Sequence, residues 1–390
     1  MNLASLAASY LRARPLQTTL SLTLLALGVA TIAMLLLVVG QLEERMERDA
    51  RGIDLVVGAK GSPMQLILAG IYHLDAPTGN IPLAAAHSLS KNRLVKKAMP
   101  LALGDSWKGF RIVGAEHAYV QHYGGKVAGR LFEKPMEAVL GAEVAARTGV
   151  GVGGRFIGAH GIGTEGEEHG EAPYSVVGTL ATTGTVLDRL VLTSIESVWH
   201  VHEKHAAGDA AEVTVLLLQY ASPLAAATLP RQINAQSELQ AASPAYETAR
   251  LFRIVGVGVE ALRAFALVLM LAAGLSVFIA LYTALEERRY DLAVMRALGA
   301  SPGRLFGLLL FEGLLLALAG ALLGVLLGHA FTAVLGAWLE SQQQYRLTAL
   351  DFRPGELAVL GAAIGIGVIA AALPAWRAYR TDVSRTLAQG

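Results

Sequence analysis

The stretch LEERRYDLAVMRALGASPGRLFGLLLFEGLLLALAGALLGVLLG, residues 285–328, places a short charged connector directly before a long apolar run. Its first twenty residues hold seven charged side chains, whereas the rest contains a single carboxylate, Glu312. A membrane-spanning helix needs about 20 predominantly apolar residues. The run therefore predicts a transmembrane helix, and the connector predicts the aqueous segment that precedes it.

Three other segments are long enough to span a membrane and contain no charged residue at all. The whole chain is 54% hydrophobic and 16% charged, against about 25% charged residues in a typical soluble domain. Leu16–Leu42 is too long for the apolar core of a cleaved signal peptide, so we interpret it as a retained helix. The four predicted spans are 16–42, 264–285, 305–339 and 357–376.

Basic residues indicate how these helices are oriented, since short cytoplasmic flanks are enriched in Lys and Arg. With four spans, all three groups of flanking arginines fall on one side: Arg12 and Arg14; Arg288, Arg289, Arg296 and Arg304; Arg377, Arg380 and Arg385. We therefore expect a multi-pass protein of the bacterial inner membrane with both termini in the cytoplasm. The expected segments are a cytoplasmic lead-in (1–15), the first span (16–42), an extracytoplasmic domain with a stalk (43–253), stalk and second span (254–285), a cytoplasmic coupling element (286–304), the third span (305–339), an extracytoplasmic loop (340–356), the fourth span (357–376) and a cytoplasmic tail (377–390).

The large insert between the first two spans predicts a mixed α+β domain. Four alternating segments favour strands, at 111–120, 174–181, 189–193 and 212–219. Three segments favour helices, at 141–149, 193–205 and 222–236. The apolar segment 64–72 is too short to span a membrane, and we interpret it as core or as an apolar surface for cargo. Helical periodicity resumes at Tyr246 and continues into the second span, which predicts a stalk.

Two features of the membrane segments predict local packing. Glycines recur every four residues at Gly320, Gly324 and Gly328, and again at Gly361 and Gly365, a spacing that lets helices approach closely. Carboxylates inside a membrane are costly and are usually paired. The nearby Arg304 suggests that the intramembrane polar residue Glu312 lies near the cytoplasmic end, within reach of a basic partner, and we favour a structural salt bridge over proton coupling. We expect His329 to be a packing or headgroup residue.

The connector itself predicts an amphipathic helix over 287–298, which the sequence GASPGR then ends. Apolar Leu292, Val294, Met295 and Leu298 are interspersed with charged residues. Such a helix fits docking to a protein partner, and it equally fits a helix that anchors on lipid headgroups. The residues alone leave both interpretations open.

Several stretches resemble the FtsX/MacB-type ABC transporter permeases, the type VII or mechanotransmission class. The connector and third span carry one motif of that family, and SYLRARPLQTTLSLTLLALGVA (9–30) resembles its first helix. ALPAWRAYRTDVSRTLAQG (372–390) resembles its closing pattern, with Val383 where proline is usual. MEAVLGAEVAARTGVGVGGRF (136–156) and YSVVGTLATTGTVLDRLVLTSIESV (174–198) are similar to its periplasmic core domain.

The resemblance implies a permease that works as a homodimer, with each subunit docked to a separate cytoplasmic ABC ATPase. ATP-driven closure of the ATPase would then be relayed to the extracytoplasmic domain, for export or extraction of a lipoprotein, lipid, peptide or drug. The implied coupling residues are Glu286, Glu287, Arg288, Arg289, Asp291, Leu292, Val294, Met295, Arg296 and Arg304. Arginines would pair with acidic rims of the ATPase groove, and Leu292, Val294 and Met295 would fill it.

The sequence also argues against other classes of protein. It contains no GxxxxGK[ST] phosphate loop, since 58–63 and 124–129 have the wrong spacing. We therefore expect no ATPase activity and no cofactor in this chain, with ATP and Mg²⁺ bound by the partner. A net charge of +1 does not favour nucleic-acid binding. The absence of cysteine excludes disulfides and thiolate metal ligands.

Two alternatives stay open at this point. The same motion would suit a regulatory mechanotransmitter that activates a periplasmic or outer partner such as a cell-wall hydrolase. Histidines also gather in two places of the insert, as His160 and His169 and as His200, His202 and His205. Imidazole is a good ligand for zinc, copper or nickel, so metal-related transport or sensing is a further hypothesis. No spacing here fixes a coordination geometry.

Overall fold

The computed structural model describes residues 3–161, 173–202, 211–343 and 347–380. The chain divides into two compact units. We call residues 1–42 with 255–390 the membrane unit, and residues 43–254 the large domain. Each is described by itself.

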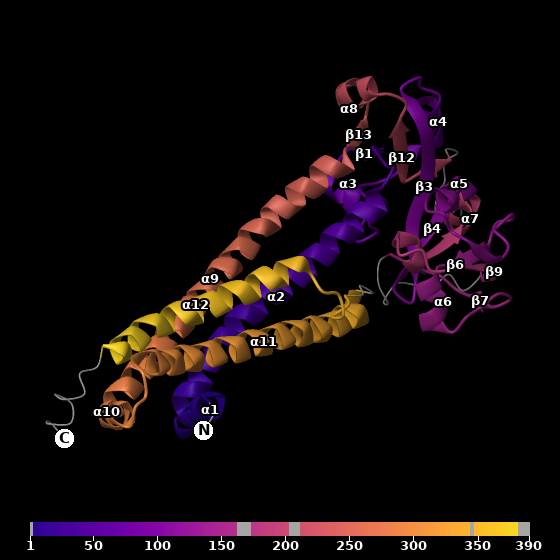
Figure 1. Cartoon of the computed structure of the whole chain (residues 1–390). Helices are drawn as coiled ribbons and strands as arrows, with labels where there is room; N and C mark the ends of the chain where they lie inside the picture. The colour runs from indigo at the N-terminus through magenta and orange to yellow at the C-terminus, as the bar shows by residue number, and fades with distance from the viewer. Residues whose placement is uncertain (1–2, 162–172, 203–210, 344–346, 381–390) are drawn as a thin grey trace. The chain divides into compact units, whose positions relative to one another are not determined.

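Within the described residues, four helices are long and apolar enough to cross a membrane. They are α2 (Pro15–Ala50), α9 (Pro244–Glu287), α11 (Pro302–Gln343) and α12 (Pro354–Tyr379). One helix therefore precedes the large domain and three follow it, which confirms the predicted fold class. Two short helices, α1 (Leu3–Ala13) and α10 (Arg289–Ala297), lie at one end of the bundle beside the C-terminal end of α12 (Figure 1).

The long helices α2 and α9 extend beyond the predicted spans. A 44-residue helix is about 66 Å long at a rise of about 1.5 Å per residue, roughly twice the thickness of a bilayer core. The helix α9 begins at Pro244 in the large domain and ends at Glu287 in the membrane unit, with no break in its helical structure. The predicted continuity of stalk and second span is thus present.

Glycine allows α11 to pack closely against α2. A methyl group added to Gly324 would lie 2.5 Å from Cβ of Val29, and one added to Gly320 would lie 2.8 Å from Leu25. The same face includes Gly328, whose added methyl group would meet Ala33. Close packing is therefore found for the glycines predicted in the third span.

The fourth span differs from that expectation. Added methyl groups on Gly361 and Gly365 would meet nothing within 4 Å among the described residues. Instead α12 contacts α11 through Gly367, which faces Ala317. The four-residue spacing alone does not show which face of a helix meets a neighbour, and here a different glycine does so.

The large domain is built on an 11-stranded mixed sheet, in the order β13-β1-β12-β3-β4-β10-β6-β9-β5, with β7 paired to β9 and β8 to β3 (Figure 1). Its strands are β1 (Leu55–Ala59), β3 (Val95–Trp107), β4 (Phe110–Ala115), β5 (Val127–Gly129), β6 (Glu137–Leu140), β7 (Arg155–Phe156), β8 (Ala159–His160), β9 (Tyr174–Leu180), β10 (Leu190–Thr193), β12 (Val215–Tyr220) and β13 (Leu239–Ala242). A second pair of strands joins β2 (Ile81–Pro82) to β11 (Glu212–Val213). Most neighbours are antiparallel, and β10 runs parallel to β4.

Short helices cover this sheet: α3 (Pro63–Gly70), α4 (Leu83–Ser90), α5 (His117–His122), α6 (Ala142–Thr148), the 3₁₀ helix η1 (Val186–Arg189), α7 (Ile195–His202) and α8 (Pro223–Gln236). The segment 64–72 forms most of α3, and its buried Leu66 and Ile67 assign it to the core. The strand predicted over 111–120 ends at Ala115, because the chain turns into α5, where Tyr119 and Val120 are buried. The hydrophobic pattern of residues 111–120 did not reveal the change from strand to helix within this segment.

Candidate functional site at the charged connector

The connector forms a separate helix, α10, because the chain leaves the helical conformation on both sides of it. The helix α9 ends at Glu287, and Arg288 has a non-helical backbone. After α10, Gly299 adopts a φ of 98°, which glycine tolerates without strain. Pro302 then begins α11, a position that suits its fixed φ. The amphipathic helix is therefore present but spans 289–297 rather than the predicted 287–298.

One face of α10 is covered by the chain's own helices. Leu292 is only 3% exposed and belongs to an apolar cluster with Leu285, Leu305 and Leu309. Met295 packs partly against the same cluster. Leu292 is thus not available to fill a partner's groove in this arrangement, contrary to what the family resemblance implied. The hydrophobicity of Leu292 predicted that its side chain is buried, but whether it faces a partner or the chain's own helices depends on how α10 packs.

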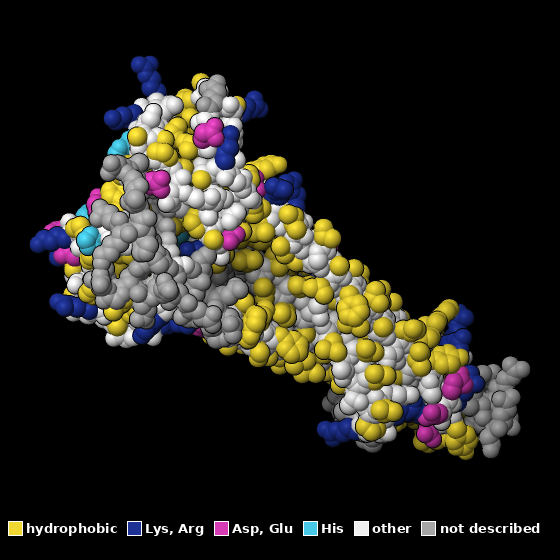
Figure 2. All heavy atoms as spheres, turned by 180° about the vertical axis from the view of Figure 1, so that it is seen from behind, with side chains coloured by type: hydrophobic (Ala, Val, Ile, Leu, Met, Phe, Trp, Pro, Cys, Tyr) yellow, Lys and Arg dark blue, Asp and Glu magenta, His cyan; other side chains and the backbone are white. Residues whose placement is uncertain are grey.

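The opposite face of α10 is open. Tyr290 is 54% exposed and Leu298 is 84% exposed. Five of the charged candidates are exposed as well, whereas Val294 and Arg296 are half-buried; the exposed five are Glu286, Glu287, Arg289, Asp291 and Arg304. Tyr290 was missed as a site residue, although its spacing of eight residues from Leu298 places both on one side of a helix. Figure 2 shows charged side chains gathered at the end of the membrane unit where α10 lies.

Arg288 points in the other direction, into the bundle. Its Nη1 lies 3.4 Å from Oε1 of Glu312, whose side chain is 3% exposed. The guanidinium also lies 3.6 Å from the ring centre of Tyr10 in α1, a stacked geometry that Arg favours. Glu312 therefore has a basic partner, as expected, but that partner is Arg288 rather than Arg304, which is exposed.

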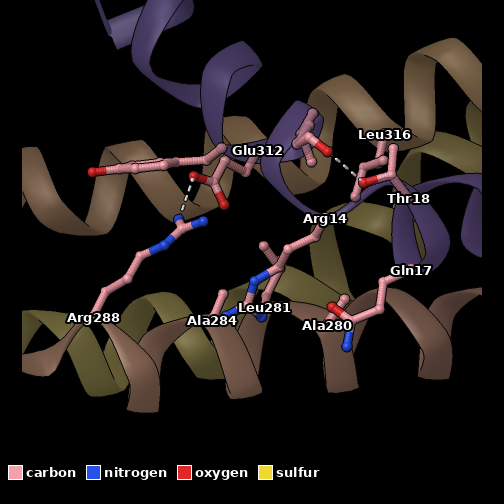
Figure 3. Close-up of a pocket in the computed structure, with 11 residues that line it drawn as sticks. Arg14, Gln17, Thr18, Ala280, Leu281, Ala284, Arg288, Glu312 and Leu316 are labelled. Carbon is pink, nitrogen blue, oxygen red and sulfur yellow. Dashed lines mark hydrogen bonds and ion pairs between the residues drawn. The ribbon is translucent and has the colours of Figure 1, made fainter.

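A small cavity lies beside this pair (Figure 3). Arg14 lies in it, and its guanidinium also forms an ion pair with Glu287. Nη1 of Arg14 and Oε1 of Gln17 are buried there without a protein hydrogen-bond partner among the described residues. The cavity has a volume of about 20 Å³. It is lined by Tyr10, Leu11, Arg14, Gln17, Thr18, Ala280, Leu281, Ala284, Arg288, Glu312 and Leu316.

At the other end of the membrane unit, a second polar group joins α11 to α12. Nε2 of His329 lies 2.8 Å from Oε2 of the fully buried Glu356. The other oxygen of Glu356 accepts a hydrogen bond of 2.8 Å from the backbone N–H of Arg353, which caps α12. His329 is thus hydrogen-bonded to a carboxylate rather than placed for a headgroup. The sequence did not predict this pair, because Glu356 lies 27 residues from His329 along the chain.

In the large domain, polar contacts hold the end of α2. Oδ1 of Asp49, near the end of α2, accepts a hydrogen bond of 2.7 Å from the backbone N–H of Val186. Its other oxygen lies 3.6 Å from Arg189, and its carbonyl accepts 2.6 Å from the hydroxyl of Tyr123. These contacts fix the last turn of α2 on the domain.

The histidine hypothesis gains no support from the described residues. His169 and His205 lie outside them, and of the remaining three only the side chain of His200 is described, exposed on α7. Within residues 3–161, 173–202, 211–343 and 347–380, no group of three or more His, Asp or Glu side chains is placed to hold a metal ion. His73, in contrast to the exposed His200, is buried. Its burial lowers the pKa of the imidazole well below the usual value and favours the neutral ring.

Comparison with known families defines the class of protein. The MacB-like periplasmic core domain matches residues 18–236, and the FtsX-like permease C-terminal domain matches residues 263–383. The chain therefore belongs to the FtsX/MacB-type ABC transporter permeases. Two separate family signatures, one on each side of α9's stalk, agree with the order of helices and domain described above.

Individual relatives are distant. The chain is 26% identical to the lipoprotein-releasing system transmembrane protein LolC of Neisseria meningitidis, over 78% of each chain. It is also 26% identical to the macrolide export ATP-binding/permease protein MacB of Syntrophobacter fumaroxidans, over 31% of this chain and 16% of that one. Among solved structures, the periplasmic region of MacB from Actinobacillus actinomycetemcomitans aligns with 53% of this chain and 97% of its own, at 12% identity and a TM-score of 0.34. The extracellular domain of YknZ from Gram-positive bacteria aligns with 48% and 98%, at 14% identity and a TM-score of 0.30.

Proposed function

We propose that this chain is a permease subunit that couples ATP hydrolysis by a separate cytoplasmic ATPase to movement of its large domain outside the inner membrane. The observation that carries the proposal is the two-sided packing of α10. Its inner face packs on the membrane helices through Leu292, and Ala293 is buried as well, whereas Tyr290 and the C-cap residue Leu298 are exposed. A partner that pushes on the outer face therefore pushes on the bundle. ATP and Mg²⁺ would be bound by that partner.

The helix α9 supports the relay of motion. It joins the connector to the large domain as one helix of 44 residues, without an internal proline. Sharp kinks in helices arise mostly at proline or at a local break in the hydrogen-bond ladder. A continuous helix between the two units is suited to carry a displacement from its cytoplasmic end to the domain.

The orientation rests on the basic flanks. Arginines surround α10 and precede α2, and by the positive-inside rule this supports a cytoplasmic position for the connector and both termini. The large domain then lies outside. An ATPase is a cytoplasmic enzyme, so this orientation is the one in which it could reach Tyr290 and Leu298.

An exposed apolar stripe on α9 supports a homodimer. Phe265, Val268 and Leu275 lie on one side of the helix at spacings of three and seven residues, and each is more than half exposed. The stripe continues to Val257, which is 74% exposed and lies beyond the charged pair Glu260 and Arg263. A second copy of α9 would cover the stripe along its whole length.

The class of cargo follows from chemistry that the relatives share. One is named for lipoprotein release and another for macrolide export, and both kinds of molecule are amphipathic. We therefore propose export or extraction of an amphipathic cargo, such as a lipoprotein, lipid, peptide or drug. If a deletion strain shows a cell-wall defect and no accumulated cargo, the same coupling serves regulation of an extracytoplasmic partner instead.

The test is co-purification of the tagged full-length chain with an ABC ATPase encoded by the same cell. We expect Arg289→Glu combined with Leu298→Ser to lower the recovered ATPase at least tenfold, since both side chains are exposed on α10. The control is Arg12→Glu, which reverses an exposed arginine on the same predicted side of the membrane. Equal recovery with both variants, at equal levels in the membrane, would overturn the role of α10.

A further inference from the structure

We propose that Arg14 is a positioning residue that ties the first membrane helix to the connector, so that α10 moves α2 as well as α9. The proposal rests on the proposed function for its mechanical part. Its structural part concerns four charged residues at the cytoplasmic end of the bundle, Arg14, Glu287, Arg288 and Glu312, which we call the ionic cluster.

The ionic cluster joins three segments that are far apart in the sequence. Arg14, which lies directly before α2, forms an ion pair with Glu287, the last residue of α9. Arg288 pairs with Glu312 in α11 and lies over the ring of Tyr10 in α1. Figure 3 shows Arg14 and Arg288 in the same cavity as Glu312.

The charges of the cluster balance, with two arginines and two glutamates. This matters because Glu312 is almost fully buried, and an uncompensated charge in such a place is strongly destabilising. Arg14 and Gln17 both line the cavity, and Nη1 of Arg14 and Oε1 of Gln17 are buried polar atoms that need hydrogen-bond partners. The cavity volume of about 20 Å³ is enough for one water molecule.

The mechanical consequence follows from the order of the chain. The connector is covalently joined only to α9 and α11, so nothing in the sequence links it to α2. The ionic cluster provides that link. Farther along the bundle, the hydroxyls of Ser21 and Ser276 lie 2.8 Å apart, and Gly28 packs against Met270. A displacement of α10 is therefore passed to α2 at its first turn, and α2 follows α9.

The first experiment uses the full chain alone, in lipid nanodiscs, with hydrogen exchange followed by mass spectrometry. We expect Arg14→Gln to raise the exchange rate of amides in 286–298 and in 10–18 at least tenfold, while the strands of the large domain keep their rates. The matched control is Arg12→Gln, an exposed arginine two residues away, which should leave both segments within twofold of the unchanged chain. Unchanged exchange in Arg14→Gln would overturn the ionic cluster, and so would an equal rise throughout the chain.

The second experiment separates positioning from mere stability. In the complex with the co-purified ATPase, replacing ADP by ATP should change exchange in 286–298 and in 10–18. In Arg14→Gln we expect the response at 286–298 to persist and the response at 10–18 to be lost. A response at 10–18 that survives in Arg14→Gln would overturn the link to α2. If the unchanged complex shows no nucleotide response anywhere, the proposed function fails, whereas the first experiment still decides the cluster.

Discussion

The hydroxyl of Tyr72 lies 2.8 Å from the hydroxyl of Thr248 and 3.4 Å from the carbonyl oxygen of Met46. Thr248 belongs to the first turns of α9 and Met46 to the last turns of α2. One buried side chain of the large domain therefore holds both long helices where they enter the domain.

Replacing Tyr72 by Phe should weaken this junction without changing its shape. The variant keeps the ring but leaves the hydroxyl of Thr248 and the carbonyl of Met46 without their shared partner, at a cost of about 1 kcal/mol. We expect the thermal midpoint of the large domain to fall by about 2–4 °C, measured by circular dichroism on the full chain in detergent. Tyr246→Phe is the control, because that tyrosine is exposed on the same helix as Thr248. Equal midpoints for both variants would contradict a junction held by Tyr72.

Gly324→Ala should disrupt the membrane unit far more than Gly361→Ala. The added methyl group at 324 would lie 2.5 Å from Cβ of Val29 and 2.8 Å from the carbonyl oxygen of Ala26, so α2 and α11 must separate. Overpacking of this kind costs about 1–3 kcal/mol. At Gly361 nothing lies within 4 Å among the described residues, so the change should be small. The measurement is the fraction of folded protein after heating in detergent, by size-exclusion chromatography; similar losses for the two variants would refute the packing face.

Arg288→Met should destabilise the protein more than the double variant Arg288→Met with Glu312→Leu. The single change leaves the carboxylate of Glu312 buried without its partner, which costs about 3–5 kcal/mol, whereas removing both charges of a buried pair is often nearly neutral. Unfolding in increasing sodium dodecyl sulfate, followed by circular dichroism, compares them. If the double variant is as unstable as the single one, the instability of Arg288→Met does not come from an unpaired Glu312, and the prediction is contradicted.

The large domain should lose stability in acid partly through Glu137. Arg130 donates hydrogen bonds to both of its carboxylate oxygens, and the backbone N–H of Glu133 donates another at 2.9 Å. These bonds favour the ionised form and lower the pKa of Glu137 from 4.5 to about 2. The unfolded chain therefore binds the proton at higher pH than the folded chain does. The stabilisation is complete above about pH 5 and is lost as the pH falls towards 2.

Glu137→Gln tests that dependence. We expect it to lower the free energy of unfolding at pH 7 by about 1 kcal/mol, because Arg130 is partly exposed and solvent screens the pair. The difference from the unchanged chain should shrink between pH 5 and pH 3 in circular-dichroism melts of the full protein. Glu133→Gln removes a neighbouring exposed carboxylate as the control. A difference that stays constant over this range would contradict the assigned pKa.

Several features could be predicted from the sequence because they depend on local chemistry. Runs of apolar residues long enough to span a bilayer defined the one-plus-three arrangement, and the absence of proline after Pro244 predicted that α9 is continuous. The high density of charged residues predicted that the connector lies outside the membrane. The family resemblance added the likeness to FtsX/MacB-type permeases, which the two family matches confirm. The coupling role of the connector stays a prediction.

The tertiary structure alone decided which residues meet. Leu292 and Leu298 are equally apolar, yet one is buried in the bundle and the other is exposed. Glu312 pairs with Arg288 rather than with Arg304, although Arg304 is nearer in the sequence. Hydropathy and charge are properties of single residues and short windows, so they determine which segments enter the membrane. Partners depend on the rotation of each helix about its axis, which is set by packing against helices that lie far away along the chain.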